Sequence, residues 1–329
     1  MTGKEQKNSA NLWQRFLQNK YFPQILLTAV LLLLILILST TSEYFFSWKN
    51  FRNILDQCAV YLILSIGMTF VIAGGGVDLS VGSTAGLCGV IMALLIKGGC
   101  PTGLAIGAGI LAGAAIGTAN GLFIAKIKIN PFITTLSTMI IVRGIALVLT
   151  GGVSIYGFTQ AFKWFGTGSV GPLNPPIIIS LLLTVAGFIL LNRTLWGKYC
   201  LALGGNGEAL RRNGVNTTAY RISIYAVSGF CAGLAGLIMT ARLNSAAPLA
   251  GSGYEMDAIA AVVLGVGCFN GGVGSVTGTF IASLTLAVIR NGLTMLAIST
   301  DYQQVVTGSI ILLAIIAARL RSRKNRAEE

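Results

Sequence analysis

The sequence contains no histidine and little charge: Asp, Glu, Lys and Arg together make up 10% of its 329 residues. A soluble domain carries roughly 25% charged residues, so this chain has too few to cover its surface for water. Without histidine it cannot hold a Ser-His catalytic pair, and a zinc or haem centre loses its commonest ligand. The low charge and the 54% share of hydrophobic residues indicate an all-α, polytopic integral membrane protein.

Two further absences concern cofactors. The six cysteines are scattered without a CxxC pair, and most fall in apolar runs, where a free thiol behaves as a small hydrophobe. The chain has no G-x-x-x-x-G-K-[ST] loop to hold a nucleotide phosphate, and "GVGCFNGG" and "GGVGSVTG" do not form G-x-G-x-x-G. We therefore expect no metal or cofactor on this chain and no enzyme activity of its own.

Long apolar runs are the main positive feature. A helix needs about 20 apolar residues to cross the hydrocarbon core of a bilayer, and about ten runs qualify, with eight to eleven all defensible. The run after Pro23 is followed by "STTSEYFF", without a small-residue cleavage site, and reads as a first span. The predicted spans are 23–42, 54–73, 80–97, 101–124, 131–150, 175–191, 221–241, 257–269, 273–291 and 302–319.

The basic residues predict the orientation. Of the 23 Lys and Arg, sixteen fall in alternate loops and the two tails, six fall in the opposite loops, and Arg143 lies within a span. Because positive loops stay in the cytoplasm, both termini are predicted to be cytoplasmic, which agrees with an even number of spans. The net charge of +13 thus reflects topology and not a nucleic-acid partner. We expect one transmembrane domain over 1–329, with cytoplasmic tails at 1–20 and 320–329 and a large cytoplasmic loop at 192–221.

An internal repeat is visible at a shift of 192 residues. It aligns Val81-Gly82-Ser83 with Val273-Gly274-Ser275, and the apolar run 69–72 with 261–264. Both copies run in the same direction, so the repeat is parallel and suggests a duplicated transporter half. Many of the 42 glycines are spaced as small-xxx-small, in the series 103, 107 and the series 109, 113, 117, 121. That spacing is typical of helices that pack closely in lipid.

The segment "AGGGVDLSVGS" at 73–83 puts an aspartate beside three glycines between two spans. Non-helical backbone at membrane depth survives only where protein or a water-filled cavity satisfies it. We predict that Gly74, Gly75 and Gly76 supply a sharp turn with positive φ, and that Asp78, Ser80 or Ser83 caps the next helix. The other interpretation is that Asp78 binds substrate directly, because an ionisable residue at this depth is a functional candidate.

The cytoplasmic loop contains a short helix signal in "GGNGEALRRNGV". Asn206 is a good N-cap, Glu208 suits the positive end of a helix, and Arg211 and Arg212 suit the negative end. Gly214 then fits the position after the last turn. Such a helix either grips a partner or is a solvated loop helix whose arginines only set topology.

Three separated blocks resemble one known family. They are "GMTFVIAGGGVDLSVGS" (67–83), "YCLALGGNGEALRRNGVNTTAYRI" (199–222) and "ARLNSAAPLAGSGYEMDAIAAVVLGVGCFNGGVGSVTGT" (241–279), followed by "NGL" at 291–293. In this order they are similar to the sugar-importing ABC transporter permeases of the ribose type. The resemblance implies a multi-pass permease subunit in the bacterial inner membrane. Its expected partners are a cytoplasmic ATPase, which holds ATP and magnesium, an extracytoplasmic sugar-binding protein, and a second permease copy or a paralogue. It also favours ATPase coupling for the helix of Asn206, Glu208, Arg211, Arg212 and Gly214.

Two sets of polar residues are candidates for contact with cargo or with the binding protein. A sugar needs hydroxyl-matching groups on an otherwise apolar wall, and each candidate serves equally well as a helix–helix hydrogen bond. The candidates for the pathway are Asp78, Asn120, Asn130, Arg143, Asn244 and Asn291, and those for binding-protein contact are Tyr254, Glu255 and Asp257.

Three other functions compete with sugar import. An ion-coupled secondary transporter usually needs several buried acids, and only Asp78 is expected to lie deep. An intramembrane enzyme is opposed by the missing histidine and catalytic pair. An ABC importer of another cargo, such as an autoinducer, inositol, nucleoside or amino acid, stays open, because the sequence does not identify the cargo.

Overall fold

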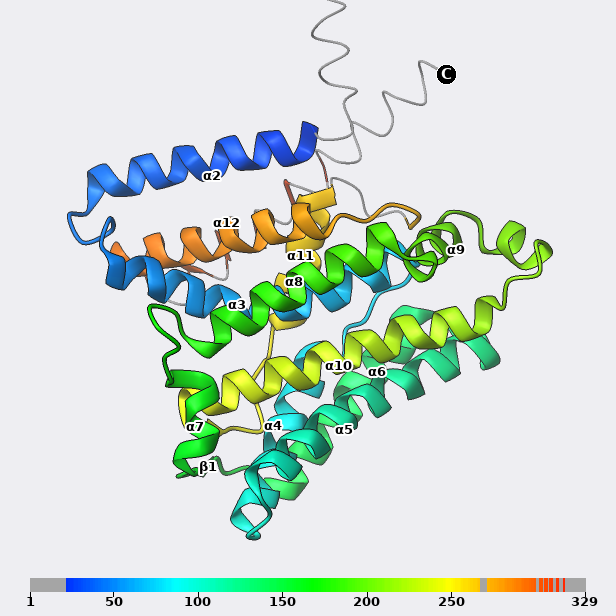
Figure 1. Ribbon diagram of the computed structural model, residues 1–329, viewed down its shortest axis with the longest axis horizontal. Helices are drawn as coiled ribbons and strands as arrows, with labels where there is room; N and C mark the ends of the chain where they lie inside the picture. The colour runs from blue at the N-terminus through cyan, green and yellow to red at the C-terminus, as the bar shows by residue number, and fades with distance from the viewer. Residues whose placement is uncertain are drawn as a thin grey trace, which may run out of the picture.

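The computed structural model describes residues 22–266 and 271–299 and a few single positions between 302 and 316, and it is a helical bundle (Figure 1). The helices are α2 (Phe22–Thr41), α3 (Trp48–Ala73), α4 (Val81–Lys97), α5 (Thr102–Leu122), the π-helical turn η1 (Phe123–Ile127), α6 (Pro131–Thr150), α7 (Gln160–Thr167), α8 (Pro175–Arg193), α9 (Leu195–Arg212), α10 (Thr217–Leu243), α11 (Tyr254–Val266) and α12 (Val276–Met295). Two short antiparallel strands, β1 (Ile155–Tyr156) and β2 (Ser245–Ala246), complete the described part.

The polytopic helical fold is confirmed. Each predicted span from 23–42 to 273–291 falls on a helix, and the last, 302–319, lies largely outside the described residues. Among the described helices, seven are long and apolar enough to cross a membrane, whereas α4 and α11 are shorter. The cytoplasmic termini and the parallel repeat stay predictions.

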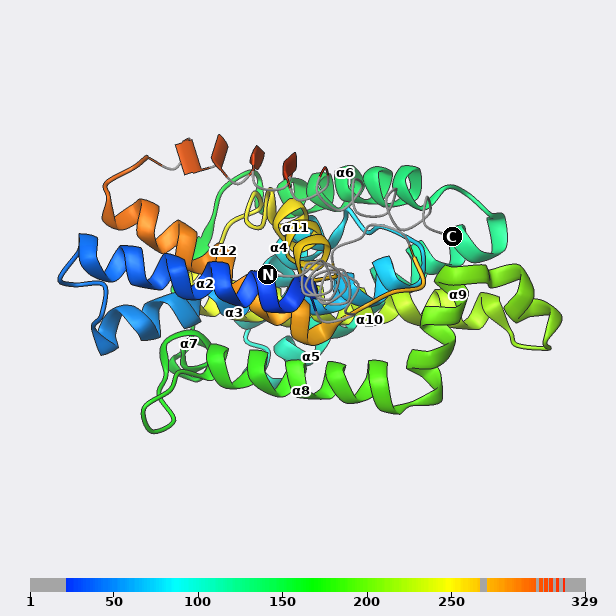
Figure 2. The same cartoon turned by 90° about the horizontal axis from the view of Figure 1, so that it is seen from above.

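The helices are arranged around α10, which packs on α5, α3 and α4. Figure 2 shows α6 and α8 along opposite flanks of the bundle. Helix α2 lies at an edge and exposes leucines such as Leu32 and Leu36, as expected for a face in contact with lipid. The short helices α4 and α11 are buried along nearly their whole length, which explains why they are apolar on every side.

The bundle has two distinct ends. Helix α9 lies at one end, which we call the α9 end, and β1, β2 and α7 lie at the other, the β1–β2 end (Figure 1). Two predicted loops prove to be structured. The loop 151–174 contains β1 and α7, and the loop 192–221 is mostly α9, which is separated from the end of α8 by the single residue Thr194.

The glycine series on α5 divides into two groups. A Cβ at Gly113 would lie 2.4 Å from the Gly229 carbonyl oxygen, and one at Gly117 would lie 2.1 Å from the Tyr225 carbonyl oxygen. These positions allow the backbones of α5 and α10 to touch. A Cβ at Gly103 or Gly107 would meet nothing within 4 Å. Close helix packing is therefore confirmed for the 109–121 series and does not extend to the 103–107 pair.

The α5–α10 contact predicts opposite effects for two similar substitutions. Gly117→Ala should destabilise the protein by about 1–3 kcal/mol, because the added methyl forces two backbones apart. Gly107→Ala on the same helix should be neutral or stabilising by up to about 1 kcal/mol, because alanine favours the helix. Thermal unfolding in detergent would measure both, and equal unfolding temperatures for the two variants would contradict the assigned contact.

Candidate translocation and coupling sites

The three glycines after α3 make the turn in different ways. Gly74 caps α3 with φ −76°, whereas Gly75 has φ +80°, a conformation that favours glycine. Gly76 is required for lack of space, since a Cβ there would lie 2.3 Å from the Tyr225 hydroxyl. The expectation of positive φ at all three is therefore corrected: it holds at Gly75 alone.

This turn takes part in a glycine junction, which consists of residues 73–76, 204–205 and 271–272. The backbone N–H of Gly272 donates to the carbonyl oxygen of Ala73 at 2.9 Å. A Cβ at Gly204 would lie 1.9 Å from the same oxygen, and one at Gly271 would lie 2.7 Å from Cα of Gly75. Three glycine-rich segments that are far apart in the sequence thus meet backbone to backbone.

Asp78 follows the junction and is 1% exposed. Its Oδ1 accepts from the backbone N–H of Ser80 at 3.0 Å and from the Ser80 hydroxyl at 2.6 Å, and its Oδ2 accepts from the Ser228 hydroxyl at 2.9 Å. The first two bonds close a local turn, and the third ties that turn to α10. Asp78 therefore holds the turn before α4 and does not cap its first free N–H groups.

The two serines also depart from the expected capping. Ser80 precedes α4 but makes no side-chain capping bond, because its hydroxyl donates to Asp78. The hydroxyl of Ser83 donates backwards to the Ser80 carbonyl at 2.9 Å. Both serines therefore stabilise the turn through hydrogen bonds inside it. Their role is structural, as predicted, but neither hydroxyl caps the free N–H groups of α4.

Asn120 joins the same buried network. Its amide donates to the Ser80 hydroxyl at 3.0 Å, and its carbonyl oxygen accepts from the Thr138 hydroxyl at 2.6 Å. The network thereby links the α3–α4 turn with α5, α6 and α10. Among the pathway candidates, the structure brings Asp78 and Asn120 together in a set whose hydrogen bonds are already made.

Arg143 and Asn244 organise the segment at the β1–β2 end. The Arg143 guanidinium donates to the carbonyl oxygens of Pro248 at 2.9 Å and Ala250 at 2.7 Å. Asn244 ends α10 with φ +48°, and its side-chain oxygen accepts from the Phe158 backbone N–H at 3.2 Å. Both residues hold backbone, so they lie apart from the Asp78 network.

The remaining asparagines are likewise engaged. Asn130 caps α6 by accepting from the Phe132 N–H at 2.9 Å. Asn291 exchanges two hydrogen bonds with Asn50 of α3, at 3.1 and 2.9 Å. The six pathway candidates are thus not gathered into one site. Sequence reasoning named the polar groups but not their partners, which lie on other helices.

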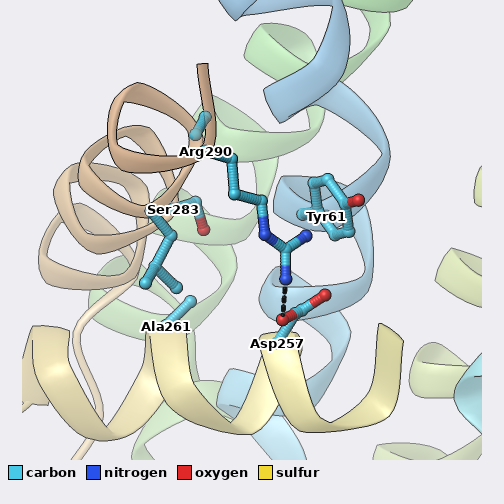
Figure 3. Close-up of a pocket in the computed structure, with 7 residues that line it drawn as sticks. Tyr61, Asp257, Ala261, Ser283 and Arg290 are labelled. Carbon is cyan, nitrogen blue, oxygen red and sulfur yellow. Dashed lines mark hydrogen bonds and ion pairs between the residues drawn. The ribbon is translucent and has the colours of Figure 1, made fainter. Parts of the chain in front are cut away.

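Helix α11 starts with the three residues predicted to face a binding protein. Glu255 and Asp257 are only 8% and 7% exposed, and the Tyr254 ring packs on Tyr61 of α3 at 4.7 Å between centroids. A contact through the two carboxylates requires an exposed surface, and the structure buries them instead. Asp257 forms an ion pair with Arg290 of α12 (Figure 3).

Arg290 was counted among the six basic residues of the less basic loops, although it falls inside the predicted span 273–291. The structure places it within α12, five residues before Met295, and its guanidinium stands 4.7 Å from the centre of the Tyr61 ring. A signal was present in the sequence: Ser283, Leu286 and Arg290 recur at helical spacing and share one face. Tyr61 and Ser283 were missed for the same reason, since their partners come from other helices.

The short capped helix in the large loop is present as the last part of α9. Asn206 breaks the helix with φ −153° and accepts from the Ala209 N–H at 2.9 Å, as an N-cap does. Glu208 pairs with Arg211 at 2.9 Å and with Arg212 at 3.3 Å, and the following Gly214 has φ +81°. The bond from Arg211, followed by that from Arg212, lowers the pKa of the exposed Glu208.

A groove borders this helix at the α9 end. It lies between the η1–α6 connection on one side and the last turns of α9 and the first turn of α10 on the other. Its polar lining includes Lys128, Asn130, Glu208, Arg211 and Arg221. The groove is open, and its charged residues are three basic ones and one acidic one, so it suits contact with another protein better than enclosure of a small molecule.

Comparison with known proteins gives consistent matches over most of the chain. Residues 50–315 match the family described as "Branched-chain amino acid transport system / permease component". The ribose import permease protein RbsC of Escherichia coli (strain K12) is 43% identical over 279 residues, which cover 84% of this chain and 87% of that protein. RbsC of Haemophilus influenzae (strain ATCC 51907 / DSM 11121 / KW20 / Rd) is 44% identical over 320 residues, which cover 94% of this chain and 97% of that protein. The D-allose transport system permease protein AlsC of Escherichia coli (strain K12) is 38% identical over 317 residues, or 96% and 95%. No solved structure matches significantly.

The Asp78 bonds predict that two substitutions differ. Asp78→Asn should keep much of the transport activity, because an amide oxygen still accepts from Ser80 and an amide N–H can donate to the Ser228 hydroxyl. Asp78→Leu should abolish activity, because each buried donor left unpaired costs about 1–3 kcal/mol. Uptake normalised to the amount of protein in the membrane separates the variants. Equal loss in both would instead favour a proton- or cation-carrying carboxylate.

Proposed function

The chain belongs to the permease family described as a branched-chain amino acid transport system component, and on this premise we propose that its cargo is a ribose-like monosaccharide. It is a multi-pass protein of the bacterial inner membrane and the permease subunit of an ABC sugar importer. The choice of cargo rests on sequence identity to permeases whose names state a sugar. Permeases named for ribose are 43% and 44% identical, against 38% for one named for D-allose and 33% for one named for L-arabinose.

The proposed assembly supplies what the chain lacks. A separate cytoplasmic ATPase binds ATP and magnesium, an extracytoplasmic binding protein delivers the sugar, and a second copy of this chain or a paralogue completes the membrane part. The capped helix at 206–214 supports the proposed contact with the ATPase, because it projects exposed, ordered charges at one end of the bundle. The groove beside it, which includes Lys128, Arg211 and Arg221, offers a surface for the same partner.

An amino acid is the second candidate cargo, favoured by the description of the family itself. A zwitterion needs one group for its carboxylate and another for its ammonium, whereas a sugar needs only hydroxyl partners. The two cargoes can therefore be separated by direct competition in uptake.

The test is transport by the complete importer in vesicles. The permease, its ATPase and its binding protein should take up labelled ribose only with ATP, and the purified permease alone should hydrolyse no ATP. Uptake of leucine but not of ribose would show that the cargo is an amino acid and not a sugar. Uptake driven by an ion gradient without ATP, or ATP hydrolysis by the permease alone, would contradict the assignment as an ABC permease.

The coupling role predicts a specific loss. Alanine at both Glu208 and Arg211 removes the pair that orders the capped helix, so recovery of the ATPase with the permease and sugar uptake should both fall roughly tenfold, equivalent to about 1.4 kcal/mol of binding. Membrane insertion should be unchanged, because both side chains are exposed. Lys198→Ala, an exposed charge earlier on α9, is the matched control. If the double variant recovers the ATPase normally, the helix does not couple to the ATPase and its arginines only set the membrane topology.

A further inference from the structure

The ion pair between Asp257 and Arg290 lies inside the bundle, between α11 and α12. The side chains are 9% and 23% exposed. Charges within membrane-spanning segments normally face partners or a water-filled cavity and mark functional pathways. A guanidinium has five N–H donors and an ionised carboxylate has two acceptor oxygens. One donor and one oxygen form the bond to each other, so hydrogen-bonding capacity remains on both groups.

Ser283 lies on the same face of α12 as Arg290, and its hydroxyl is buried without a described partner. It is 2% exposed, and within the described part of the chain its Oγ has no hydrogen-bond partner. Thr279 and Thr285 on the same helix instead donate to the carbonyl four residues earlier, at 3.0 and 2.8 Å. Buried hydroxyls are nearly always bonded, so this one is placed for a partner outside the helix.

A small cavity collects these three groups. It is lined by Tyr61, Asp257, Ala261, Ser283, Leu286, Ala287 and Arg290. Figure 3 shows the Ser283 hydroxyl and the ends of Arg290 and Asp257 turned toward the same space, with Tyr61 behind the guanidinium. The cavity volume is about 10 Å³, close to the roughly 10–15 Å³ that one water molecule needs. In this conformation it accommodates a single polar group.

The chemistry of the cavity selects the kind of group. The carboxylate of Asp257 accepts, the guanidinium of Arg290 donates, and the hydroxyl of Ser283 does either. A sugar hydroxyl donates once and accepts at its lone pairs, so it can satisfy all three. A free carboxylate or ammonium would add an uncompensated charge to a buried site whose own charges already sum to zero, and burying an unpaired charge is costly. A neutral hydroxyl therefore fits best.

From this arrangement we propose that Asp257, Ser283 and Arg290 form a subsite that binds one hydroxyl of the transported sugar. The inference rests on the proposed function, since it assumes a polyhydroxylated cargo. The sugar hydroxyl donates to Asp257 and accepts from Arg290, and Ser283 contributes the third bond. The ring of Tyr61 keeps the guanidinium in place through its face.

The test compares ribose with its 2-, 3- and 5-deoxy analogues in the complete importer. Wild type, Ser283→Ala and Thr285→Val are measured with the same binding protein, so that its own preference cancels in each variant-to-wild-type ratio. Thr285→Val is the matched control, because that hydroxyl already bonds within its helix. Ser283→Ala should lower ribose uptake about fivefold, the effect of one lost hydrogen bond.

The decisive result is selectivity among the analogues. One deoxy sugar, lacking the hydroxyl that Ser283 binds, should be taken up by Ser283→Ala within twofold of the wild-type rate, while the others fall like ribose. An equal factor for all four sugars would show a packing effect and overturn the subsite, as would no effect on any of them. If the wild type carries leucine and none of the four sugars, the proposed function itself falls and the subsite with it.

Discussion

The backbone contact at the glycine junction is the constraint on which the α9 end of the structure depends. The carbonyl oxygen of Ala73 accepts from Gly272 at 2.9 Å and lies where a Cβ on Gly204 would stand, 1.9 Å away. No side chain fits between these segments, so the end of α3, α9 and residues 271–272 approach more closely than ordinary packing allows. Because non-helical backbone needs polar partners at this depth, the three segments satisfy one another. Their mutual dependence explains why three separated parts of the sequence are rich in glycine.

Two further elements follow this junction along the chain. On one side the chain continues from Gly76 through Val77 to Asp78, whose carboxylate fixes the start of α4 and reaches α10 through Ser228. On the other side Asn206, two residues after Gly204, starts the exposed capped helix. A rigid backbone contact therefore separates the surface proposed to meet the ATPase from the buried network by only a few residues.

The sequence predicted the helices well because their causes are local. Span boundaries follow from the length of apolar runs, and the Asn206 cap and Gly214 end follow from residue types at fixed offsets. The partners of buried polar groups could not be predicted, because they come from other helices. Arg290 was counted as a loop charge although it falls inside the predicted span 273–291, and its partners Asp257 and Tyr61 lie on other helices. Gly74 and Gly76 looked alike in the sequence, yet one caps a helix and the other makes room for Tyr225.

Two buried acids illustrate how the surroundings decide the role of a residue. Asp78 accepts three hydrogen bonds from serines beside it and across the bundle, which leaves it little capacity for a ligand. Asp257 has one partner, Arg290, and shares a cavity with a hydroxyl that no described residue binds. In a bundle where every unpaired polar group is costly, a satisfied acid stabilises the fold, whereas spare capacity persists where a ligand can use it. Depth in the membrane therefore does not distinguish the two aspartates, whereas their hydrogen bonds do: those of Asp78 favour its structural role, and Asp257 keeps capacity for a further partner.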